Sequence, residues 1–82
     1  MTYFKFTLLS QIKSALDEKE VERVVERSIQ RLKSSNVNGH LIQRFIVAMD
    51  KTLDETKLEE PSERVLQNVD TAIRSFRKLH RV

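Results

Sequence analysis

His40 and His80 are the residues best suited to act as a base near neutral pH or as a nitrogen ligand to a metal ion. Helical di-iron proteins place a glutamate three residues before such a histidine, on facing helices. In this sequence Val37 precedes His40 at that spacing, and Arg77 precedes His80. The spacing does not support a metal centre, and we expect no metal, no cofactor and no small-molecule ligand.

Nucleophilic and acid–base chemistry have equally little support. The sequence has no cysteine, no serine stands in a Gly-x-Ser-x-Gly elbow, and one glycine cannot build a phosphate-cradling loop. The adjacent carboxylates Glu59 and Glu60 could work as an acid and a base only inside a cleft. Their place beside the start of a predicted helix is explained by favourable charge near its positive end. We therefore expect a protein that is not an enzyme.

The basic residues form two groups that could bind a polyanion or a protein partner. Arg23, Arg27 and Arg31 lie four positions apart, so they would form a ridge along one helix. The second group occupies the C-terminal turns of the chain and consists of Arg74, Arg77, Lys78 and Arg81. If the two groups lie side by side, they present a basic surface that a phosphate backbone would recognise.

Neighbouring acidic residues weaken that interpretation. Glu20 and Glu26 flank the first ridge at helical spacing, and Asp70 precedes Arg74 by four positions. Cations in a last helical turn also complement the helix dipole without any ligand. The sequence leaves open whether the basic residues bind nucleic acid or only balance charges within the chain.

The N-terminal stretch offers a candidate apolar partner patch, formed by Tyr3, Phe4 and Phe6. Together with nearby lysines it could instead dock on an anionic membrane, or it could pack into the core of the domain. We expect at least three of the four phenylalanines to be buried. The alternating pattern of residues 3–7 leaves open whether they are helical or extended. Leu58 and Leu66 are a second candidate patch.

The elements that would position these residues are helices. The chain has 82 residues, of which 39% are hydrophobic and 33% charged, with one glycine and one proline, which is too few turn residues for an all-β fold. Apolar residues recur at three- and four-residue spacing in four segments, approximately 4–16, 18–34, 39–57 and 61–80. We predict an all-α, compact antiparallel bundle of about four helices, with residues 1–82 as a single domain.

Local signals place the helix starts. Asp17 is a predicted N-cap, with Glu20 three positions later as in a capping box. Either Asn36 or Asn38 could cap the third helix. Pro61 is well placed as the first residue of the fourth helix, where its missing N–H costs nothing.

The composition also bears on compartment and class. The longest uninterrupted apolar run, Phe45–Met49, is far shorter than the roughly 20 residues of a membrane span. With no cysteine and no pattern of a signal peptide, we expect a cytoplasmic protein. We predict a small interaction module or regulatory accessory protein that acts through protein–protein contacts or self-association. The alternative is a nucleic-acid-binding protein, and the choice between monomer and dimer stays open.

Overall fold

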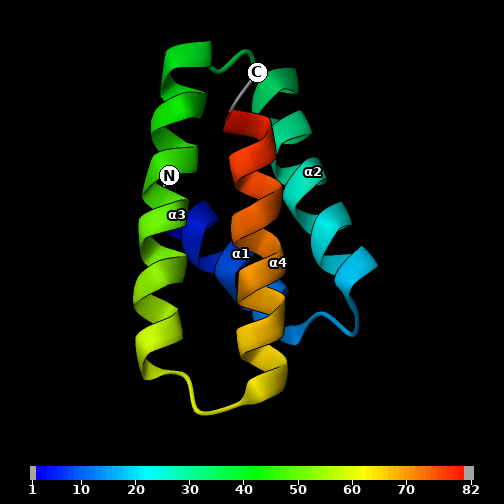
Figure 1. Ribbon diagram of the computed structural model, residues 1–82. Helices are drawn as coiled ribbons and strands as arrows, with labels where there is room; N and C mark the ends of the chain where they lie inside the picture. The colour runs from blue at the N-terminus through cyan, green and yellow to red at the C-terminus, as the bar shows by residue number, and fades with distance from the viewer. Residues whose placement is uncertain (1, 81–82) are drawn as a thin grey trace.

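A computed structural model describes the backbone of residues 2–80 and the side chains of residues 4–79, and these residues form helices without any β-strand (Figure 1). The helices are α1 (Thr2–Ser14), α2 (Glu18–Ser34), α3 (Gly39–Glu59) and α4 (Glu63–His80). They pack against one another, which confirms the predicted all-α bundle. No helix in the described part of the chain is long and apolar enough to cross a membrane.

The central element is α4, which packs against each of the other three helices. In Figure 1 it stands between α3 and α2, while α1 crosses behind it. The contact between α2 and α3 is much smaller than the contact of either helix with α4. Short connections, residues 15–17, 35–38 and 60–62, link the helices, and α2, α3 and α4 run in alternating directions in Figure 1.

The core is formed by aliphatic side chains from all four helices and by two phenylalanines. Phe45 and Phe76 are buried, and their rings meet edge to face with centroids 6.3 Å apart. Phe4 is half-buried against Phe45, at a centroid distance of 5.5 Å, whereas Phe6 is 67% exposed. The expectation that three phenylalanines are buried is therefore wrong. The N-terminal segment is helical, so positions 4 and 6 point to different sides of α1.

The start of α2 follows the sequence prediction. Asp17 has an extended backbone, and its carboxylate accepts a hydrogen bond of 2.8 Å from the backbone N–H of Glu20. This contact satisfies one of the N–H groups that have no partner within the helix. The C-terminal end of α1 differs from the prediction. Because α1 stops at Ser14, Leu16 lies in the connection and is 74% exposed, not on an apolar helix face.

The two asparagines between α2 and α3 have different roles. Asn38 is the N-cap of α3, and its side chain accepts a hydrogen bond of 2.7 Å from the N–H of His40. Asn36 ends α2 in the left-handed conformation, with φ of 60°. Its N–H donates to the carbonyl of Lys33, and the N–H of Val37 donates to the carbonyl of Leu32. This pair of bonds is the Schellman motif, which satisfies the last carbonyls of a helix.

The start of α4 lies two residues later than predicted. Ser62 is the residue before the helix, because its backbone carbonyl accepts from the N–H of Leu66 and its hydroxyl accepts from the N–H of Val65 at 3.4 Å. Pro61 precedes this cap and is not the first helical residue. A serine side chain can accept a hydrogen bond at a helix start and proline cannot, which explains the position.

Candidate interaction surfaces

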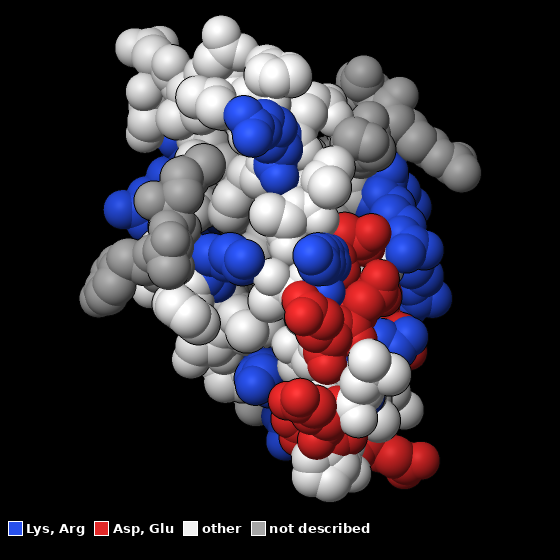
Figure 2. All heavy atoms as spheres, turned by 90° about the vertical axis from the view of Figure 1, so that its left-hand side faces the viewer, with Lys and Arg blue, Asp and Glu red and all other residues white. Residues whose placement is uncertain are grey.

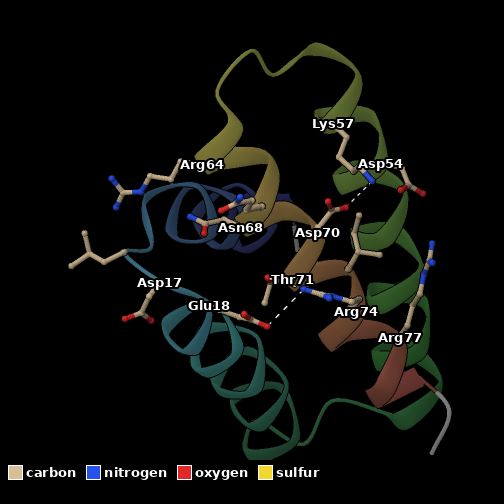
Figure 3. Close-up of a pocket in the computed structure, with 13 residues that line it drawn as sticks. Asp17, Glu18, Asp54, Lys57, Arg64, Asn68, Asp70, Thr71, Arg74 and Arg77 are labelled. Carbon is tan, nitrogen blue, oxygen red and sulfur yellow. Dashed lines mark hydrogen bonds and ion pairs between the residues drawn. The ribbon is translucent and has the colours of Figure 1, made fainter.

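Charged side chains from α2, α3 and α4 line a hollow beside α4, which we call the α4 hollow (Figure 3). Its floor is the face of α4 from Arg64 to Arg77. Its sides are the connection before α2 with Glu18, the first residue of α2, and the C-terminal half of α3, including Asp54 and Lys57. Both acidic and basic side chains line it, so the hollow has no single sign of charge.

Three of the four basic residues that line the α4 hollow contact acidic residues. Lys57 Nζ lies 2.7 Å from Asp70 Oδ1, and Arg74 Nη2 lies 3.7 Å from Glu18 Oε1. These exposed ion pairs add little stability. They do reduce the positive charge that this face could offer to a polyanion.

Arg77 makes a similar contact across the boundary between α3 and α4. Its Nε lies 3.4 Å from Asp50 Oδ1, an ionic contact and not a hydrogen bond. Arg64, at the other end of the hollow, points its guanidinium toward the backbone carbonyl of Ala15 at 3.5 Å. Three of the cations on α4 therefore face partners within their own chain.

A second hollow lies between α1 and α2, and we call it the α1–α2 groove. One bank is the α1 face from Phe4 to Ser14, and the other is the α2 face from Glu20 to Arg31. Leu8 and Val24 are buried residues that line its floor. The two banks lie on neighbouring helices joined by a short connection, so the groove is part of one supersecondary unit.

The floor of the α1–α2 groove is apolar in character. Ser28 also lines it, but its hydroxyl donates a hydrogen bond of 2.6 Å to the carbonyl of Val25 within α2. The Ser28 hydroxyl therefore donates its proton within α2 and not to a ligand. Phe4 contributes a half-buried aromatic ring at one end of the groove. Leu8 and Val24 are only 2% and 8% exposed, so Phe4 is the apolar lining residue with surface left for a ligand to cover.

The α2 bank of the groove is basic. Arg27 and Arg31 line it, are exposed, and form no ion pair within the described residues. Glu20 is the one acidic residue among those lining the groove, and it lies near the end where α1 and α2 are joined. The groove thus combines an apolar floor with two cations that have no acidic partner in the described structure.

The predicted basic residues are divided between these two hollows, which share no lining residue. Arg27 and Arg31 belong to the α1–α2 groove, while Arg74 and Arg77 belong to the α4 hollow. The remaining predicted positions lie elsewhere: Arg23 and Lys78 are exposed outside both hollows, and Arg81 lies outside the described residues. Which hollow a basic residue lines depends on the neighbouring helix that its side of the helix faces. The sequence alone does not give this packing.

The predicted aromatic patch is also divided. Phe4 packs on Phe45 and lines the α1–α2 groove, whereas Phe6 is exposed. The side chain of Tyr3 lies outside the described part of the structure. Leu58, of the second candidate patch, is 87% exposed, while Leu66 is half-buried. His40 is exposed at the start of α3, and the side chain of His80 is outside the described residues.

The α1 bank of the groove was not predicted from the sequence, and on the outer side of α3 only Leu58 was. Gln11 and Ser14 are unremarkable polar residues, and only their placement beside α2 makes them part of a groove. On α3, Val47 is 56% exposed on the side away from the core. The signal was present in the sequence, because positions 47 and 58 fall outside the inward-facing periodicity.

Comparisons of this chain with protein-family models, with curated proteins and with solved structures found no match. Within the part of the chain that the structure describes, no group of three or more histidine and acidic side chains is arranged to hold a metal ion.

Proposed function

We propose that this protein is a non-enzymatic interaction module that binds a helical segment of a protein through the α1–α2 groove. The observation that carries this proposal is the combination of an apolar floor, where Phe4 is the half-buried apolar residue, with the exposed cations Arg27 and Arg31. Apolar burial supplies affinity, while charged groups at the rim select the partner and its orientation.

The length of the groove matches a short helix. It runs along α1 from Phe4 to Ser14, ten positions, which at the rise of an α-helix is about 15 Å. This is the length of about three helical turns, enough for a row of apolar anchors at i, i+3 or i+4, and i+7. Arg27 and Arg31 would pair with carboxylates on the side of the bound helix that faces α2. The ligand class is therefore an acidic amphipathic helix.

A nucleic acid is the competing ligand, because arginines on a ridge also bind phosphates. Two observations favour a protein. The floor between the arginines and α1 is apolar, which a phosphate backbone does not need. The cations of α4 that would extend the basic surface face acidic partners, as in the pairs Arg74–Glu18 and Arg77–Asp50.

The experiment is a binding titration with a labelled synthetic peptide that forms an acidic amphipathic helix, followed by fluorescence anisotropy. We expect saturable binding that weakens about tenfold or more in the double variant Arg27→Glu, Arg31→Glu, because the pairs become repulsive. Lys78→Glu is the matched control, since Lys78 is exposed outside both hollows. It should bind the peptide like the unchanged protein.

A duplex DNA titration at several salt concentrations distinguishes the alternative. Binding to DNA that falls steeply with salt, and that is weakened equally by the α2 double variant and by Lys78→Glu, would replace our proposal with the nucleic-acid one. Absence of any peptide binding would also contradict the proposal, because the groove would then lack the affinity that its floor implies.

A further inference from the structure

The outer side of α3 carries a second surface, which we call the α3 stripe and define as Val47, Lys51, Asp54, Glu55 and Leu58. These residues line one shallow depression on the surface of α3. Val47 and Leu58 are 56% and 87% exposed, although the opposite side of the same helix contributes Phe45, Met49 and Leu53 to the core. Helix α3 is thus apolar on its inner side and carries two further apolar residues on its outer side.

Val47 and Leu58 act as two ends of one row. They are eleven positions apart, which on an α-helix is about three turns and brings them to within ~20° of the same side. Their separation along the axis is about 16 Å. Asp54 and Glu55 lie between them and are exposed. The α3 stripe is therefore itself an acidic amphipathic helix surface.

We propose that the α3 stripe of one copy of this protein docks in the α1–α2 groove of a second copy. The proposal rests on the proposed function, because it names the occupant of the same groove. The lengths agree, about 16 Å between Val47 and Leu58 and about 15 Å along the groove from Phe4 to Ser14. Both surfaces expose apolar atoms that a neighbouring copy would cover.

The charges of the two surfaces are complementary. The groove offers Arg27 and Arg31, and the stripe offers Asp54 and Glu55, none of which forms an ion pair within the described residues. Lys51 is the one cation of the stripe and opposes the contact. Figure 2, which shows the side of the molecule where α3 lies, has its acidic side chains gathered in a band rather than scattered.

Other charged residues near the α3 stripe are engaged within their own chain. Asp50 faces Arg77 at 3.4 Å, and Lys57 faces Asp70 at 2.7 Å. They contribute less to a contact between copies than the residues without an internal partner do. The complementarity therefore depends on a small set of positions, which makes it testable by charge reversal.

The placement of the two surfaces determines the kind of assembly. The groove lies between α1 and α2, and the stripe lies on α3, on the other side of α4 in Figure 1. A contact between two different surfaces is heterologous, so copies join groove to stripe and form an open chain, or a ring where the rotation between copies closes. The average mass therefore rises with concentration, and an open chain does not stop at a dimer.

The test is sedimentation of the full chain over a wide range of concentrations at low and high salt. We expect the average mass to rise continuously with concentration and the association to weaken as salt screens the pairs. The groove variant Arg27→Glu, Arg31→Glu and the stripe variant Asp54→Arg, Glu55→Arg should each associate about tenfold or more weakly on its own. Lys51→Glu should associate more tightly than the unchanged protein.

The decisive experiment mixes the groove double variant with the stripe double variant. In the mixture, each reversed stripe can meet a reversed groove and each natural stripe a natural groove, so association should return to near that of the unchanged protein. A mixture that stays monomeric, while circular dichroism shows both variants folded, would overturn the inference. A dimer of fixed mass that ignores both pairs of substitutions would overturn it as well.

The outcomes also separate this inference from the proposed function. If the unchanged protein stays monomeric but the synthetic acidic helix still binds the groove, the second copy is not the occupant and the proposed function stands. If the chain associates through the stripe while the peptide fails to compete, the groove is not the docking site and both proposals fail.

Discussion

The side chain of Asn68 in α4 donates a hydrogen bond of 2.9 Å from its Nδ2 to the backbone carbonyl of Ala15, 53 positions earlier in the chain. Ala15 directly follows α1, where carbonyl groups have no partner within the helix. Asn68 is buried. A residue of the central helix thus satisfies the backbone at the end of α1 and fixes where the chain turns toward α2.

Replacing Asn68 by alanine should lower the free energy of unfolding by about 1–3 kcal/mol, because the buried Ala15 carbonyl would lose its closer donor and keep only the Arg64 contact at 3.5 Å. Urea denaturation followed by circular dichroism measures the change. The control is Gln67→Ala, at an exposed neighbour on the same helix, where a change within about 0.5 kcal/mol is expected. Equal effects at the two positions would show that the hydrogen bond has no special importance.

Asn36 offers a second stability test, because its φ of 60° lies in the left-handed region that favours glycine. Asn36→Gly should leave stability unchanged or raise it by up to about 1 kcal/mol, and Asn36→Val should lower it by about 1–2 kcal/mol. The matched control is Ser35→Gly, where φ is −88° and glycine gives no such advantage. Thermal unfolding of the four proteins decides the matter, and a stabilising Ser35→Gly would contradict this explanation.

The two phenylalanines at opposite extremes of exposure should differ sharply. Phe76 has no exposed surface, so Phe76→Ala should cost about 3–5 kcal/mol, a large share of the stability of a small domain. Phe76→Leu is the variant to measure if the alanine variant does not fold. Phe6, which is 67% exposed, should tolerate alanine within about 0.5 kcal/mol. A large loss of stability in Phe6→Ala would contradict this exposure, because it would require a contact with Phe6 that this structure does not contain.

Gln11 provides a test of the groove that leaves its arginines in place. It lies on the α1 bank and is exposed, opposite the α2 bank that carries Arg27. In Gln11→Glu, the new carboxylate should pair with the arginines of the α2 bank in place of the carboxylates of the peptide. Binding of the acidic helical peptide should therefore weaken several-fold. Anisotropy titration measures this, with Gln11→Ala as the control for loss of the amide alone. Unchanged affinity in the glutamate variant would mean that the peptide does not use the basic bank.

Local patterns in the sequence determined the helices and several of their ends. The recurrence of apolar residues at three and four positions predicted four helices, because only one face of a helix can be buried against its neighbours. Asp17 was identifiable as an N-cap, since the bond it accepts comes from a residue three positions away. Contacts between residues so close in the chain can be predicted from the local sequence alone.

Choices between equally suitable local signals were decided by the tertiary structure. Asn36 and Asn38 both have the chemistry of a cap, and the packing of α3 places Asn38 at the helix start. Residues 3–7 alternate like a strand, yet they are helical because Phe4 packs on Phe45 in that conformation. The pattern of residues 3–7 gives no information about a partner more than forty positions away.

The surfaces depend most strongly on tertiary structure. The sequence by itself determined that Arg27 and Arg31 share one helix face and that Arg74 and Arg77 share another. Only the packing around α4 decided that the first pair borders an apolar groove with α1, while the second pair faces Glu18 and Asp50. The physical reason is that helix periodicity orders residues around one axis. The neighbours that neutralise or expose a charge lie on other helices, and only the packed bundle brings them together.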